Sequence, residues 1–153
     1  MNTPNFLVRI KGKKISCLGS QFLEILETIN IKKELFVWYG SDVEVNGDHP
    51  FKFGLQGSIP KKVGTTENMI TLAENTDQFL SGVFFALPMD QEKILDREFF
   101  TEDDPFRDIG DAVLEIRAFD TSYFEVYSND FEIIKKLANH FCSKIETHPY
   151  MET

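Results

Sequence analysis

The feature that most constrains the fold is a pair of alternating segments in the C-terminal third, separated by only three residues. In "DAVLEIRAF" at 111–119, Leu114, Ile116 and Ala118 alternate with Glu115 and Arg117, and "YFEVYS" at 123–128 alternates in the same way. Such alternation is typical of half-buried strands. Parallel strands need a connection of a dozen or more residues, and "DTS" at 120–122 is long enough only for a turn. These segments therefore predict neighbouring antiparallel strands.

Two other segments have the period of an amphipathic helix, "SQFLEILETIN" at 20–30 and "NDFEIIKKLANHFC" at 129–142. Ser20 and Asn129 are candidate N-caps, because their side chains can accept a hydrogen bond from a first-turn amide. We predict an early helix at about 20–30 and a C-terminal helix at about 130–142, each with its apolar stripe in the core. A partner-helix surface is the alternative for the second stripe. The stripes are Phe22, Ile25, Leu26 and Ile29, then Phe131, Ile134, Leu137, Ala138 and Phe141.

The remaining segments complete a mixed pattern. We predict two short strands around Gly12, further strands at 32–40, 41–47 and 77–88, and a weaker strand at 49–57. A short helix is predicted at 65–75, and one or two helical turns at 89–100. The chain has no internal repeat or linker, and 153 residues suit one domain. The sequence predicts a single α+β domain over 1–153, with a mostly antiparallel sheet.

Charge is distributed unevenly along the chain. The formal net charge is −9, but residues 65–153 hold 19 acidic and 7 basic side chains, which gives that part −12. Direct binding to nucleic-acid phosphates requires clustered Lys and Arg, so we expect no nucleic-acid partner.

The two cysteines, Cys17 and Cys142, lie far apart and form no metal or redox motif. The N-terminal apolar run is too short for a secretory signal, and "VFFAL" at 83–87 is far too short to span a membrane. We therefore expect a cytoplasmic protein with reduced thiols and no membrane association.

No high-specificity catalytic motif is present: the chain lacks GxSxG, HExxH, Walker A and GxGxxG patterns. His49, His140 and His148 are scattered, and His140 and Cys142 lie two residues apart on a predicted helix, so their side chains point in different directions. We predict no catalytic residues, no metal site and no cofactor.

One segment imitates a calcium loop. Asp42, Glu44, Asn46 and Gly47 match the first positions of an EF-hand, but Phe53 occupies the position of the bidentate glutamate. We expect strand and turn over 42–53, without calcium binding.

The segment "REFFTEDDPFRDIGDA" at 97–112 combines acids with aromatics and a proline. A solvated acidic loop, a partner-facing surface and a metal or acid–base site are alternative interpretations. We predict an ordered surface segment anchored by its apolar residues, Phe99, Phe100, Phe106 and Ile109. The acids that would face a partner are Glu102, Asp103, Asp104 and Asp108.

The 15 phenylalanines have two interpretations, a Phe-rich core or an aromatic binding surface. In the second case a ligand pocket would be lined by Trp38, Tyr39, Phe84 and Phe85.

Two pieces, "LGSQFLEILETINIKKELFVWYG" at 18–40 and "FDTSYFEVYSNDFEIIKKLANHF" at 119–141, resemble segments of short acidic bacterial proteins of the immunity-protein type. The resemblance implies a small intracellular α+β inhibitor of a secreted toxin. It carries over no catalytic residue.

Three functions follow as hypotheses. The first is a non-enzymatic protein-binding protein, an immunity-type inhibitor whose acidic surface occludes a basic partner such as a toxin or nuclease. The second is an enzyme or small-molecule binder with the aromatic pocket. The third is a housekeeping domain with an ordinary acidic surface. The sequence indicates neither the partner nor the oligomeric state.

Overall fold

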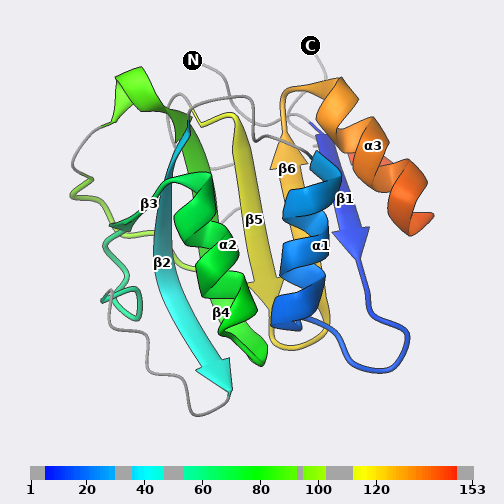
Figure 1. Ribbon diagram of the computed structural model, residues 1–153, viewed down its shortest axis with the longest axis horizontal. Coiled ribbons are helices and arrows are strands. Elements are labelled where there is room, and N and C mark those ends of the chain that lie inside the picture. The colour runs from blue at the N-terminus through cyan, green and yellow to red at the C-terminus, as the bar shows by residue number, and fades with distance from the viewer. Residues whose placement is uncertain (1–5, 30–35, 47–53, 93–94, 103–111, 148–153) are drawn as a thin grey trace.

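The computed structural model describes residues 6–29, 36–46, 54–92, 95–102 and 112–147, and these form seven strands and three α-helices (Figure 1). The strands pair in the order β3-β2-β4-β5-β6-β1-β7, and every pair of neighbours is antiparallel. The predicted α+β class with a mostly antiparallel sheet is confirmed. The elements are β1 (Phe6–Ile10), α1 (Gly19–Ile29), β2 (Phe36–Asn46), β3 (Lys61–Gly64), α2 (Thr66–Glu74), β4 (Gln78–Pro88), the 3-10 turn η2 (Met89–Gln91), β5 (Leu114–Phe119), β6 (Tyr123–Ser128), α3 (Phe131–Phe141) and β7 (Ile145–Thr147).

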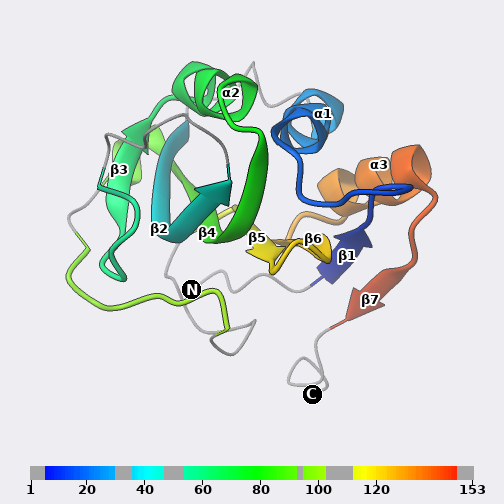
Figure 2. The same ribbon diagram turned by 90° about the horizontal axis from the view of Figure 1, so that it is seen from below.

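All three helices cover one face of the sheet (Figure 2). The main core lies between them and the strands, where Phe22 of α1 contacts Phe79, Phe84 and Phe124 with ring centroids 5.1 to 5.5 Å apart. Edge-to-face contacts between buried rings add stabilisation beyond the apolar area that they bury. Many of the phenylalanines therefore serve the core.

A second, smaller apolar cluster lies on the opposite face. Val37, Tyr39, Val83, Phe85 and Leu87 come from β2 and β4. Phe99 and Ala112, from outside the strands, complete the cluster. Because successive strand residues point to opposite faces, β2 and β4 contribute side chains to both clusters. Their sequences are therefore continuous apolar runs and do not alternate between apolar and polar residues.

The helix boundaries follow from local hydrogen bonds. The early helix occupies 19–29, and Ser20 lies inside it, so the predicted Ser20 cap is wrong. The amide of Leu18 instead donates to Gln21 Oε1 (2.8 Å), and the carbonyl of Leu18 accepts from Phe22. In α3 the cap is Asp130 rather than Asn129, with its carboxylate accepting from the amide of Glu132 (3.0 Å).

Several strand predictions need correction. Among the described residues before α1, β1 is the one strand, and residues 13–16 form no second strand. The two strands predicted at 32–40 and 41–47 are one strand, β2. Its register with β4 shifts between Ser41 and Glu44, and Asp42 has φ 55°. Of the helical turns predicted at 89–100, the described residues of that range form η2 alone. The short edge strands β3 and β7 were not predicted.

The prediction of two buried phenylalanines in α3 is also wrong. Phe131 is 44% exposed and packs edge-on against Phe6 (5.2 Å), and Phe141 is only partly buried. Ile134, Leu137 and Ala138 are buried as predicted. Within the described part of the chain, no helix has the length and apolar character needed to cross a membrane.

Candidate binding site on the open face of the sheet

The acidic segment begins on the sheet face opposite the helices. Residues 95–102, here called the strap, run below the sheet as the yellow-green trace of Figure 2. Phe99 is buried against Phe85, with ring centroids 5.7 Å apart, and the Arg97 guanidinium lies 4.8 Å from the Phe99 ring centroid. The expected anchoring role of Phe99 is therefore confirmed. Phe100 is 42% exposed, and Phe106 and Ile109 lie outside the described residues.

Hydrogen bonds to Ser41 and Ser58 hold the strap at Glu98 and Phe99. The amide of Phe99 donates to the carbonyl of Ser58 (2.7 Å). The hydroxyl of Ser41 lies 2.6 Å from the carbonyl oxygen of Phe99 and 2.8 Å from that of Ser58. The hydroxyl of Ser58 donates to Glu98 Oε2 (2.7 Å).

Thr101 attaches the second half of the strap to three neighbouring strands. Its amide donates to Asp42 Oδ2 on β2 (2.8 Å), and its hydroxyl accepts from the amide of Gly82 on β4 (2.9 Å). Its carbonyl accepts from Arg117 Nη1 on β5 (3.1 Å). Thr101 is buried, and the polar groups that it brings into the protein are paired, as burial requires.

The bulge in β2 allows two consecutive side chains, Ser41 and Asp42, to reach the strap. A regular strand would turn Ser41 and Asp42 to opposite faces. The extra residue of a bulge reverses the alternation, so both side chains reach the strap and Val43 returns to the core. Aspartate tolerates the left-handed conformation of position 42 better than most side chains do.

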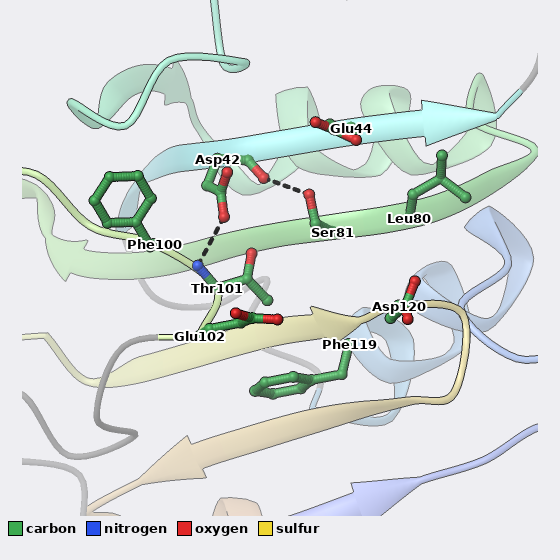
Figure 3. A pocket seen from close by; sticks show the side chains of 9 residues that line it. All are labelled: Asp42, Glu44, Leu80, Ser81, Phe100, Thr101, Glu102, Phe119 and Asp120. Carbon is green, nitrogen blue, oxygen red and sulfur yellow. Dashed lines mark hydrogen bonds between the residues drawn. The ribbon is translucent and has the colours of Figure 1, made fainter.

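Where the strap ends, the open face is hollowed into a groove of about 660 Å³ (Figure 3). Its described lining residues include four carboxylates and three large apolar side chains, and none of them is a lysine, arginine or histidine. Asp42 and Glu44 come from β2, Glu102 ends the strap, and Asp120 begins the β5–β6 turn. The complete lining is Asp42, Glu44, Leu80, Ser81, Phe100, Thr101, Glu102, Phe119 and Asp120.

Among the described residues, the four groove carboxylates have no cationic partner. Across the described ranges, no salt bridge involves Asp42, Glu44, Glu102 or Asp120. Two of these residues also accept hydrogen bonds within the protein. The Asp42 carboxylate accepts from the amide of Thr101, as described above, and the backbone carbonyl of Asp120 lies 3.4 Å from the Ser122 hydroxyl. The groove therefore has negative charge that the described residues do not balance.

Beside the groove, the same face has a network of ion pairs, and its central pair is buried. Arg117, which is fully buried, pairs with the buried carboxylate of Glu115 on the same strand. The hydroxyl of Tyr127 donates to Glu125, and Glu125 also pairs with Arg9 Nε (2.6 Å). Burial raises the pKa of Tyr127, and the neighbouring Glu125 carboxylate raises it further, so Tyr127 stays a neutral donor.

This network extends across the remaining strands. Arg117, Glu125 and Arg9 lie directly opposite one another on β5, β6 and β1, and Arg9 Nη1 continues to Glu146 Oε2 on β7 (2.7 Å). Alternating charges on adjacent strands attract each other. The network ties neighbouring strands together, because the carboxylates of Glu115, Glu125 and Glu146 each pair with an arginine.

The predicted partner-binding acids are only partly placed. Glu102 is exposed at the groove, whereas Asp103, Asp104 and Asp108 lie outside the described residues. The EF-hand-like residues Asp42, Glu44 and Asn46 lie on β2, as the strand prediction required. Within the described ranges, no three His, Cys, Asp or Glu side chains are positioned to hold a metal ion.

The four aromatic residues proposed to line a pocket are not brought together. Trp38 and Phe84 belong to the core beneath the helices, and the Trp38 indole donates to Thr66 Oγ1 (3.0 Å). Tyr39 and Phe85 stack on the opposite face, with centroids 5.4 Å apart. All four are at most 3% exposed, and adjacent residues of one strand cannot line a common cavity on one face.

Sequence reasoning missed most of the groove. Asp42, Glu44 and Asp120 were not among the predicted partner-facing acids. The one local signal for the groove was the turn "DTS" at 120–122, which places Asp120 at the end of β5. Comparison of the chain with protein-family models, with curated proteins and with solved structures gives no match in any of the three.

Proposed function

We propose that this chain is a non-enzymatic protein-binding protein of the bacterial cytoplasm, an immunity-type inhibitor that occludes a basic partner such as a toxin or nuclease. The observation that carries the proposal is the groove, where carboxylates from three separate segments meet apolar side chains and none of the described lining residues is basic. Complementary potentials steer partners together and select against wrong partners. A surface with this charge favours a cationic partner.

The scaffold beneath the groove supports the same function. Thr101 is hydrogen-bonded to three strands and Phe99 is buried, so Glu102 is held at a fixed place on the sheet. A preorganised surface loses less conformational entropy on binding, which increases affinity. The net charge of −9 adds long-range attraction to a basic protein.

The test begins with the product of the adjacent gene, which we expect to be a toxin. Association of the two purified proteins is followed by stopped-flow fluorescence at low and high salt. We expect the triple variant Glu102→Ser, Asp103→Ser, Asp104→Ser to associate several-fold more slowly at low salt, with the difference shrinking at high salt because salt screens charges.

A matched control removes three acids from the helical face. Glu27, Glu67 and Glu74 are exposed on α1 and α2, and their replacement by Gln changes the net charge by the same amount. We expect a much smaller effect on the association rate. Equal slowing by both triple variants, or no slowing by either, contradicts a specific acidic binding surface.

A further inference from the structure

We infer that one end of the open sheet face docks a second copy of this chain, an inference that goes beyond the proposed function and does not require it. The docking surface is a single row of side chains, here called the end row, that crosses the sheet from the end of β1 to β2. Phe119 stands directly opposite Tyr123 on one side and Ser81 on the other, and Ser81 stands opposite Glu44. Lys11 follows β1 directly and completes the row, with its Nζ 5.9 Å from the Tyr123 ring centroid.

The end row is open to solvent, whereas the next row along the strands is covered. Lys11 and Glu44 are exposed, and the three residues between them are half-buried. In the next row the strap carbonyls of Phe99 and Thr101 accept hydrogen bonds from side chains of the sheet. That row is buried at Ser41, Val83, Arg117 and Glu125. Figure 3 shows Glu44, Ser81 and Phe119 of the end row on three neighbouring strands.

The order of charges along the end row makes it complementary to itself. A cation, Lys11, stands at one end, an anion, Glu44, stands at the other, and Phe119 lies in the middle. An isologous interface places the same patch of both copies face to face around a two-fold axis. If that axis runs along β5 past Phe119, the two ends of the row exchange places. Lys11 of each copy then faces Glu44 of the other, and the two Phe119 rings meet at the axis.

The two end charges cannot satisfy each other within one chain. Neighbouring strands lie about 4.8 Å apart, so the four intervals from Lys11 to Glu44 span about 19 Å, which exceeds the distance of about 8 Å over which physiological salt screens exposed charges. Among the described residues, neither side chain takes part in a salt bridge. A second copy supplies the opposite charge at both ends at once.

The middle of the end row supplies the apolar part of the contact. The rings of Tyr123 and Phe119 lie 5.4 Å apart, and both are partly accessible. An aromatic centre with charged residues at the rim is the usual arrangement of a protein interface. Because each copy has a net charge of −9, two copies repel each other at long range, and we expect the dimer at high protein concentration.

The experiment is sedimentation equilibrium of the purified full chain over a concentration series, where we expect a monomer–dimer equilibrium. Lys11→Glu and Glu44→Lys each bring like charges together at both equivalent contacts. The dimer dissociation constant should therefore rise about tenfold or more in either variant. The double variant Lys11→Glu, Glu44→Lys should regain the natural dissociation constant, because the exchanged charges again face opposite charges.

The two single variants also separate local pairing from net charge. Lys11→Glu makes the chain more negative and Glu44→Lys makes it less negative, so an effect of net charge alone would move their dissociation constants in opposite directions. The matched controls are Lys135→Glu on α3 and Glu27→Lys on α1, which make the same charge changes at exposed positions of the helical face. We expect a much smaller effect from either control.

The inference is wrong if the natural chain stays monomeric throughout the series, if either single variant dimerises as the natural chain does, or if the double variant stays as weak as the single variants. These outcomes leave the proposed function unaffected, because the chain is measured without a toxin. Conversely, a dimer that follows the charge reversals stands even if the product of the adjacent gene does not bind the chain.

Discussion

At the scale of single residues, the two cysteines occupy opposite environments although each has a left-handed backbone conformation (φ 63° and 52°). Cys17 is fully buried beside the β5–β6 turn, and Cys142 is exposed at the end of α3. Burial raises the pKa of Cys17 from 9.0 to about 11, which outweighs the lowering by backbone amides of Phe119, Tyr123 and Thr121. Only the thiolate is nucleophilic, so Cys17 should be inert at ordinary pH.

We therefore expect one of the two thiols to react rapidly with dithionitrobenzoate at pH 8 and the other only after unfolding. Cys142→Ser should remove the rapid phase, whereas Cys17→Ser should leave it intact. Since the folded pKa of Cys17 lies above the unfolded value, the unfolded chain loses this proton first, and the free energy of unfolding should decrease between about pH 9 and 11. Cys17→Ser should weaken that decrease. Two rapidly reacting thiols in the native protein would refute the prediction.

At the scale of elements, the strap depends on hydrogen bonds that no local pattern specifies. In Thr101→Val the shape of the side chain is kept, but the buried amide of Gly82 loses its acceptor. An unsatisfied buried donor costs about 1–3 kcal/mol of unfolding free energy. The matched control is Thr71→Val on the exposed face of α2, where the hydroxyl merely bonds the carbonyl of Glu67 within the helix. Urea denaturation should show a clear loss for Thr101→Val and little change for the control, and equal losses would contradict the anchoring role.

The contrast between α1 and the strap explains how far the sequence could be read. Periodicity located α1 and α3, because a helical stripe is a local property of the chain. Periodicity could not predict that Phe131 is exposed. The helical stripe gives the direction in which a side chain points, but it does not show how far the sheet beneath the helix extends. Predicting the groove requires contacts between residues that are far apart in the sequence. Its carboxylates depend on the bulge at Asp42 and on contact between Asp42 and Thr101, which are 59 residues apart.

At the scale of the whole molecule, the two faces of one sheet are stabilised differently. The helices bury one face in a single large apolar core. The opposite face is apolar over β2 and β4, where Phe99 covers it, and charged over β5, β6 and β1. Arg117 lies at the junction, because it pairs with Glu115 and also donates to the strap carbonyl of Thr101. Its removal should affect both regions at once.

Arg117→Met should therefore cost about 3–5 kcal/mol of unfolding free energy, because it leaves the buried carboxylate of Glu115 without this cation. The double variant Arg117→Met, Glu115→Leu removes both charges and should be less destabilised than the single variant, since an apolar pair needs no desolvation of ions. The control is Lys62→Met, which breaks the exposed pair with Glu92 (2.8 Å) and should cost at most about 1 kcal/mol. The free energies of these variants, and of the single variant Glu115→Leu, come from urea denaturation of the purified chain. If the double variant loses as much as the sum of its single variants, Arg117 and Glu115 are not coupled, and the charged half of this face owes its stability to other contacts.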